Sequence, residues 1–199
     1  MADSSRPRIP GTAKIGGDTD PEVFCSDEQT EIEIDLARWQ LLAEGVLEAE
    51  GVRGGTELSV IFVETEAIAE LNQAFLGHAG PTDVLSFPID AADLDIPVPT
   101  SGATRGPDRA PLDPSDLPML LGDVVICPAV ASRQAPEHAG TFDDELALLV
   151  VHGILHILGH DHAEDAETAL MRGRELELLE QLHWHGKAPA GFRQEQPPS

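Results

Sequence analysis

The chain has 199 residues, which is enough for one domain with a hydrophobic core and too few for two large domains. Its 36 acidic and 12 basic residues give a formal net charge of -24, which argues against a general nucleic-acid-binding protein. The two cysteines form no CxxC pair, the first residues carry no apolar signal region, and no apolar run approaches the roughly 20 residues of a membrane-spanning helix. These features predict a soluble protein of the cytoplasm.

We expect a single domain over residues 22–185, with a tail at each end. Residues 1–21 are rich in Gly, Pro, Ser and charge without periodicity, which is typical of disorder, and residues 186–199 are expected to be a flexible C-terminal tail. Residues 91–118 are rich in proline and lack apolar periodicity, so they are predicted to be a loop insertion within the domain.

Apolar patterns predict two pairs of a strand and a helix in the first half of the chain. The alternation in Thr30–Leu36 indicates a strand, and the helical spacing that follows it stops at Gly51. Thr56–Val63 alternates like a half-buried strand, and Glu64–Phe75 places its apolar residues on one helical face.

Two short segments, Thr82–Ile89 and Leu121–Pro128, are rich in β-branched and aromatic residues and flanked by Gly and Pro, which predicts two neighbouring strands. A nearly apolar, and therefore buried, helix is expected after them. Thr141 and Asp144 form a capping box at its start, and Gly159 can take the left-handed conformation that ends a helix.

A last helix is predicted over residues 163–184. Asp161 and Glu164 form a second candidate capping box, and Leu170, Leu176 and Leu179 are assigned to its apolar face. Together the elements predict an α+β fold, in which helices pack on a small mixed sheet of about four strands and the apolar helix lies centrally, its C-terminal end opening into a cleft.

Four of the eight histidines lie between residues 152 and 162. His152 and His156 are four residues apart on one helical face and can share a tetrahedral metal, and the turn at Gly159 can bring His162 back as a third ligand. Three histidines leave one position for water, as in catalytic zinc sites, where the pKa of bound water falls to about 7. The spacing therefore predicts one zinc ion per chain; the alternative is a set of hydrogen-bonded histidines at a core edge.

Two other polar residues near this motif each have two possible roles. Asp161 either accepts a hydrogen bond from an imidazole or caps the next helix. Glu145 either supports the site or interacts with the helix dipole, and the second reading is favoured. Metzincin proteases share the histidine spacing but carry a glutamate as general base where this chain has Gly153, so a metzincin is disfavoured.

The blocks "HGILHILGHDH", "LNQAFLGHAGPTDVLSFP" and "LGDVVIC", in this order of elements, resemble the YbeY family of bacterial rRNA-maturation endoribonucleases over residues 31–184. The resemblance implies a zinc-dependent, single-strand-specific endoribonuclease that acts in 16S rRNA 3′-end maturation and ribosome quality control. It implies His152, His156 and His162 as metal ligands, rRNA as substrate, and the small ribosomal subunit or its associated proteins as partners. Neither DNA nor a membrane is expected as a partner.

Two positions depart from the family pattern. Leu76 stands where the family often has an arginine with a phosphate-binding role, so His78 or Arg133 would have to serve, although His78 can equally be an exposed loop residue. His160 replaces a tyrosine that commonly precedes the Asp-His pair. No general base is identified; the candidate catalytic residues are Asp161, His160 and Arg133.

Thr82, Asp83 and Ser86 could line the cleft opposite the zinc and hold ribose or phosphate, or they could serve the turn after Pro81. Only five basic residues fall in the predicted core, so RNA affinity is expected to be weak and targeting to depend on a partner. Two alternative functions remain: a non-catalytic ribosome-biogenesis factor stabilised by zinc, and a zinc peptidase.

Overall fold

The fold is described from a computed structural model, which covers residues 20–89, 118–160 and 165–194. The predicted N-terminal tail, apart from its last two residues, and nearly all of the proline-rich insertion lie outside this part of the chain. Asp161, His162 and the capping box formed by Asp161 and Glu164 lie outside it as well.

Ten elements follow one another along the described residues. In chain order they are β1 (Glu22–Glu28), α1 (Leu36–Ala49), β2 (Thr56–Val63), α2 (Thr65–Phe75), β3 (Val84–Pro88), β4 (Met119–Ile126), α3 (Pro128–Gln134), the short 3-10 helix η2 (Ala135–Glu137), α4 (Phe142–Ile157) and α5 (Asp165–Leu182).

The four strands form one sheet in the order β1-β2-β4-β3. β2 lies parallel to both β1 and β4, whereas β3 is antiparallel to β4, with Leu85 opposite Val125. The structure thus confirms the predicted small mixed sheet and the pairing of the two strands that flank the insertion.

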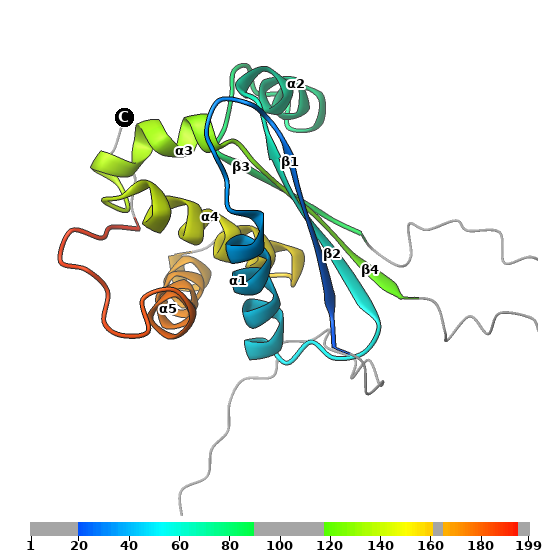
Figure 1. Ribbon diagram of the computed structural model, residues 1–199, viewed down its shortest axis with the longest axis vertical. Coiled ribbons are helices and arrows are strands. Elements are labelled where there is room, and N and C mark those ends of the chain that lie inside the picture. The colour runs from blue at the N-terminus through cyan, green and yellow to red at the C-terminus, as the bar shows by residue number, and fades with distance from the viewer. Residues whose placement is uncertain (1–19, 90–117, 161–164, 195–199) are drawn as a thin grey trace, which may run out of the picture.

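The two faces of the sheet are covered differently. α1 and α4 pack against one face, and α5 packs against both of these helices (Figure 1). The larger apolar core lies there, around Val60, Phe62 and Val124 of the sheet and Leu155 of α4. A smaller cluster on the other face joins Ile68 of α2 to strand residues such as Val125. No described helix is both long and apolar enough to span a bilayer.

The predicted position of the first strand was wrong. The first strand is Glu22–Glu28, whereas most of Thr30–Leu36 is an irregular segment that enters α1. Its alternation does not reflect sheet pairing: the buried Gln29 side chain accepts bonds from the Glu31 and Ile32 amides and donates to the Ile32 carbonyl, which curls the chain away from the sheet.

The predicted apolar face of the last helix was correct at Leu179, only half-buried at Leu176 and wrong at Leu170. Leu170 is 72% exposed, and the residues that α5 buries are Met171, Glu175, Leu178 and Leu179. An acidic residue on the buried face hides that face from a search for apolar residues. Helix α3 was missed because its seven residues are too few to establish a helical period.

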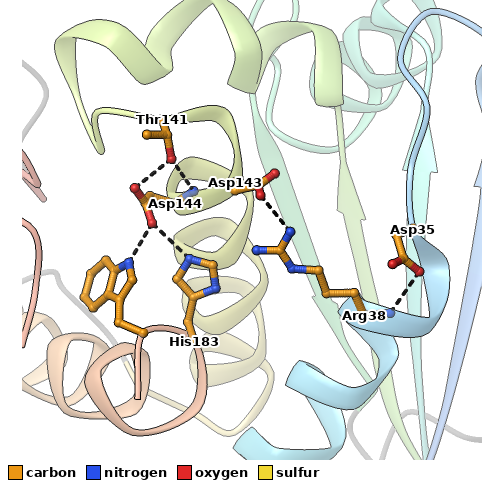
Figure 2. Close-up of polar contacts among 7 residues, drawn as sticks. Asp35, Arg38, Thr141, Asp143, Asp144 and His183 are labelled. Carbon is orange, nitrogen blue, oxygen red and sulfur yellow. Dashed lines mark hydrogen bonds and ion pairs between the residues drawn. The ribbon is translucent and has the colours of Figure 1, made fainter. Parts of the chain in front are cut away.

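The central helix α4 is held at both of its ends. Thr141 caps its start by accepting a bond from the Asp144 amide, and the Asp144 carboxylate accepts bonds from the Thr141 hydroxyl, His183 and Trp184, which ties the start of α4 to the end of α5 (Figure 2). At the other end, Gly159 is left-handed with φ 87°. Its amide bonds to the His156 carbonyl, so the predicted helix stop is confirmed.

Candidate metal centre

The last two turns of α4 bring two of the predicted ligands together. His152 and His156 are both half-buried, and their Nε2 atoms lie 3.1 Å apart. Their rings meet edge to face, with centroids 4.6 Å apart and an interplanar angle of 81°. The spacing of four residues therefore places both imidazoles at one point beside the helix, as predicted.

A buried carboxylate from α5 orients the first of these rings. His152 Nδ1 lies 2.8 Å from Glu175 Oε1, and Glu175 is only 3% exposed. An ionised carboxylate can only accept, so Nδ1 carries the proton and the Nε2 lone pair points towards His156. A carboxylate or carbonyl that accepts the second ring proton is the usual companion of a metal-binding histidine.

The donor set fits a zinc ion. Zn–N bonds of about 2.0–2.1 Å at a tetrahedral angle put two nitrogens about 3.3 Å apart, close to the 3.1 Å between the two Nε2 atoms. Within the described part of the chain no three His, Cys, Asp or Glu side chains form a complete metal-binding group, and the predicted third ligand, His162, lies outside it. The chain leaves α4 at Gly159, three residues before His162.

Gly153, the residue after His152, has no space for a side chain. A Cβ added there would lie 2.4 Å from Val124 Cγ1 and 3.3 Å from Ser86 Oγ, because α4 approaches the sheet closely at this point. A glutamate in this position would collide with β4. The packing thus gives a physical reason for the missing metzincin base.

His160 faces a different neighbour from His152 and His156. Its Nε2 lies 3.7 Å from Glu50 Oε2 at the end of α1, and Arg174 Nε lies 2.6 Å from Glu50 Oε1. Burial acts to raise the pKa of Glu50, but the bonds from His160 and Arg174 outweigh it and the pKa is lowered. In the described residues His160 therefore belongs to a link between α1, the end of α4 and α5.

The three polar residues around the start of β3 make local contacts and one contact with α4. Thr82 Oγ1 donates to Asp83 Oδ1, which also accepts from the Val84 amide. Ser86 Oγ donates to the Gly153 carbonyl, 3.1 Å away. This bond ties β3 to the residue that follows His152 in α4. Their predicted role in substrate binding stays a prediction.

Two further candidate residues, His78 and Arg133, lie at the surface. His78 is exposed between Gly77 and Gly80, both of which have positive φ, and Arg133 is exposed in the last turn of α3. Asp161 lies outside the described residues.

Glu145 bonds to neither His152 nor His156 in the described structure. It is fully buried and accepts bonds from His138 Nδ1 at 2.8 Å and from the Ala139 amide at 3.1 Å. The bond to Glu145 is the main cause that raises the pKa of His138 above 6.5, and burial opposes it. The carboxylate that contacts His152 is that of Glu175, which the sequence analysis missed. Its position in the sequence could have indicated this role. Glu175 lies four positions after Met171 and three before Leu178, on the helical face that buries both of these residues.

Comparison with known proteins gives a consistent result. The family model described as endoribonuclease YbeY matches residues 24–183. A protein named endoribonuclease YbeY from Frankia casuarinae is 43% identical over 164 residues, which cover 82% of this chain and 75% of the relative. Its namesake from Salinispora tropica is 43% identical over 138 residues, covering 69% of this chain and 82% of the relative.

A solved structure has the same fold. The solution structure of TM1509 from Thermotoga maritima matches with a TM-score of 0.51 at 27% sequence identity, over 82% of this chain and 90% of that protein.

Proposed function

Because the chain belongs to the endoribonuclease YbeY family, we propose that it is a zinc-dependent endoribonuclease that cuts single-stranded RNA. Its substrate is rRNA, and it acts in the cytoplasm in 16S rRNA 3′-end maturation and in ribosome quality control. The small ribosomal subunit or its associated proteins bring it to the substrate.

One observation carries the proposal: the Nε2 atoms of His152 and His156 lie 3.1 Å apart, and a buried Glu175 fixes the first ring. Two imidazoles that face each other at this distance are suited to sharing a cation. Zinc is the metal that imidazole ligands on one helix commonly hold, and His162 would complete the set.

When bound, zinc polarises a phosphodiester oxygen and activates a water or the RNA 2′-hydroxyl. The residues of the chain prepare the site for it. Glu175 keeps the proton of His152 on Nδ1, so that Nε2, which faces His156 Nε2, would present its lone pair to the metal. The bond from Ser86 to the Gly153 carbonyl fixes the ligand-bearing turn of α4 against the sheet.

The peptidase alternative loses support from the packing at Gly153, because no side chain fits where that chemistry needs its base. The non-catalytic alternative is tested together with the proposal, since its zinc would act only on stability.

The test compares the chain with its His156→Ala variant on a labelled single-stranded RNA that spans the 3′ end of 16S rRNA. His185→Asn serves as the matched control, because His185 is exposed, bonds only to the Gln181 carbonyl in the described structure, and has a φ of 51° that asparagine tolerates. Zinc content and circular dichroism are recorded for all three proteins.

We expect cleavage by the unchanged chain and by His185→Asn, and loss of both zinc and cleavage in a folded His156→Ala. If the unchanged chain and His185→Asn bind zinc but neither cleaves the RNA, the enzymatic function is contradicted and the assembly factor is favoured. Chelator-sensitive turnover of casein would favour the peptidase.

A further inference from the structure

The chain after α5 returns to the metal centre. Residues 188–194, here called the C-terminal strap, lie beyond residues 24–183 that the family model matches. They follow the short segment around Trp184 and run back to α5 and to His138, at the end of η2. The sequence predicts this stretch as part of a flexible tail, but its described residues make specific contacts.

Two contacts anchor the C-terminal strap to the domain. The Phe192 ring meets the Trp184 ring edge on, with centroids 4.8 Å apart, and packs against the main core. The next amide, that of Arg193, donates to the His138 carbonyl at 3.1 Å. These contacts determine where the following residue lies.

That residue, Gln194, reaches the carboxylate behind the metal site. Its Nε2 donates to Glu175 Oε2 at 2.9 Å and to the Arg172 carbonyl at 2.9 Å. A carboxylate and a carbonyl oxygen can only accept, so both require the amide nitrogen of Gln194 on this side, and its two protons satisfy one acceptor each. The other carboxylate oxygen, Oε1, is the one that receives His152 Nδ1.

We infer that Gln194 is a positioning residue of the metal centre, which acts through Glu175 on His152. Glu175 is buried and bonds at each oxygen to one partner, so the bond from Gln194 fixes the rotation of the carboxylate and directs Oε1 at the imidazole. This inference rests on the proposed function, since it needs a metal at His152. It assigns to the C-terminal strap a part in metal binding.

The test is the zinc affinity of the full chain, measured by competition with a chromophoric chelator. Loss of the outer carboxylate or carbonyl partner of a ligand commonly weakens metal binding about 10–100-fold, so we expect Glu175→Ala to fall in this range. Gln194 is one bond further away, and Gln194→Ala should weaken binding about three- to tenfold. Gln194→Glu should weaken it more, because a second carboxylate repels the first.

Lys187→Ala is the matched control. Lys187 lies just before the strap, is 91% exposed at its side chain and pairs only with Glu180 in the described structure. Its loss should leave zinc affinity unchanged.

A double-mutant cycle separates positioning from a general effect of the strap on stability. If Gln194 acts through Glu175, Gln194→Ala should have no effect in the Glu175→Ala background; Glu175→Met, which keeps the volume, replaces Glu175→Ala if that variant does not fold. The visible spectrum of the cobalt-substituted protein should change with Gln194→Ala and not with Lys187→Ala.

Unchanged affinity in Gln194→Ala, or an equal loss in both backgrounds, would overturn the inference while leaving the proposed function intact. If the unchanged chain binds no zinc, or if His156→Ala binds it equally well, the proposed function fails and the inference fails with it.

Discussion

Gly153 has a structural role beside His152, the first of the predicted ligands. Because Gly153 has no side chain, α4 can contact Val124 and Ser86 of the sheet. This close contact determines how far the neighbouring residue, His152, lies from the strands. The residue that distinguishes this motif from that of a metzincin is therefore fixed by packing.

We expect Gly153→Ala to destabilise the protein by about 1–3 kcal/mol, because the added Cβ would lie 2.4 Å from Val124 Cγ1 and the helix must move. The free energy of unfolding, measured with urea, checks this. Gly173→Ala is the matched control: Gly173 lies in α5 with nothing within 4 Å of the added Cβ, so alanine should stabilise by about 0.5–1 kcal/mol. Equal effects of the two changes would refute the packing argument.

At the scale of elements, α4 depends on contacts with segments on either side of it. Its first turn holds two neighbouring acidic residues with different surroundings. Asp143 pairs with Arg38 of α1 at 2.7 Å, and both side chains are largely exposed, whereas Asp144 is 7% exposed and accepts three side-chain bonds (Figure 2).

This difference predicts unequal costs for two adjacent substitutions. Asp144→Ala leaves the donors of His183 and Trp184 without their acceptor and should cost about 3–5 kcal/mol. Asp143→Ala removes one exposed ion pair and should cost about 0–1 kcal/mol. Urea unfolding of both variants at one salt concentration makes the comparison, and similar losses would contradict it.

The buried contact between η2 and α4 should respond to pH. The bond to Glu145 raises the pKa of His138 above its ordinary 6.5, with burial opposing, and the backbone of Gln194 and the charge of Asp83 contribute further increases. A raised pKa in the folded state means that the protonated histidine stabilises the fold fully below pH 6.5. This contribution is lost as pH rises through the folded pKa.

Unfolding free energies of the chain and of His138→Gln, measured between pH 5 and 9 under the same metal conditions, check this dependence. The difference in stability between the two proteins should be largest at low pH and shrink as pH rises. A difference that is constant across the range would show that protonation of His138 adds nothing.

The four longer helices and most strands could be predicted because their signals are local. The spacing of His152 and His156, the Thr141 cap and the stop at Gly159 each involve residues a few positions apart. Glu175 lies 23 positions after His152, and only the packing of α5 on α4 brings the two together. The first strand was misplaced for the same reason, since alternation in a sequence does not say which residues pair.

For the whole molecule, the high negative charge limits how strongly RNA can bind. The net charge is -24, and several basic residues of the described domain already have partners within it. Arg38 pairs with Asp143, Arg174 pairs with Glu50 and Glu177, and Arg53 donates to two backbone carbonyls. Arg133, which the sequence analysis named as a candidate phosphate contact, is exposed in the last turn of α3.

Binding of single-stranded RNA by the isolated chain should therefore depend only weakly on salt. Each phosphate neutralised contributes a slope of about -0.7 to log K against log salt, so one or two contacts predict a slope of about -1, compared with about -4 for a protein that makes six. Fluorescence anisotropy with the His156→Ala variant, which we expect not to cleave, measures it. Arg133→Ala should flatten the slope, and Arg53→Ala should not, because the Arg53 guanidinium is already bonded to the Glu48 and Val52 carbonyls. A slope steeper than about -3 would mean that the chain carries a phosphate-binding surface of its own and needs no partner to reach RNA.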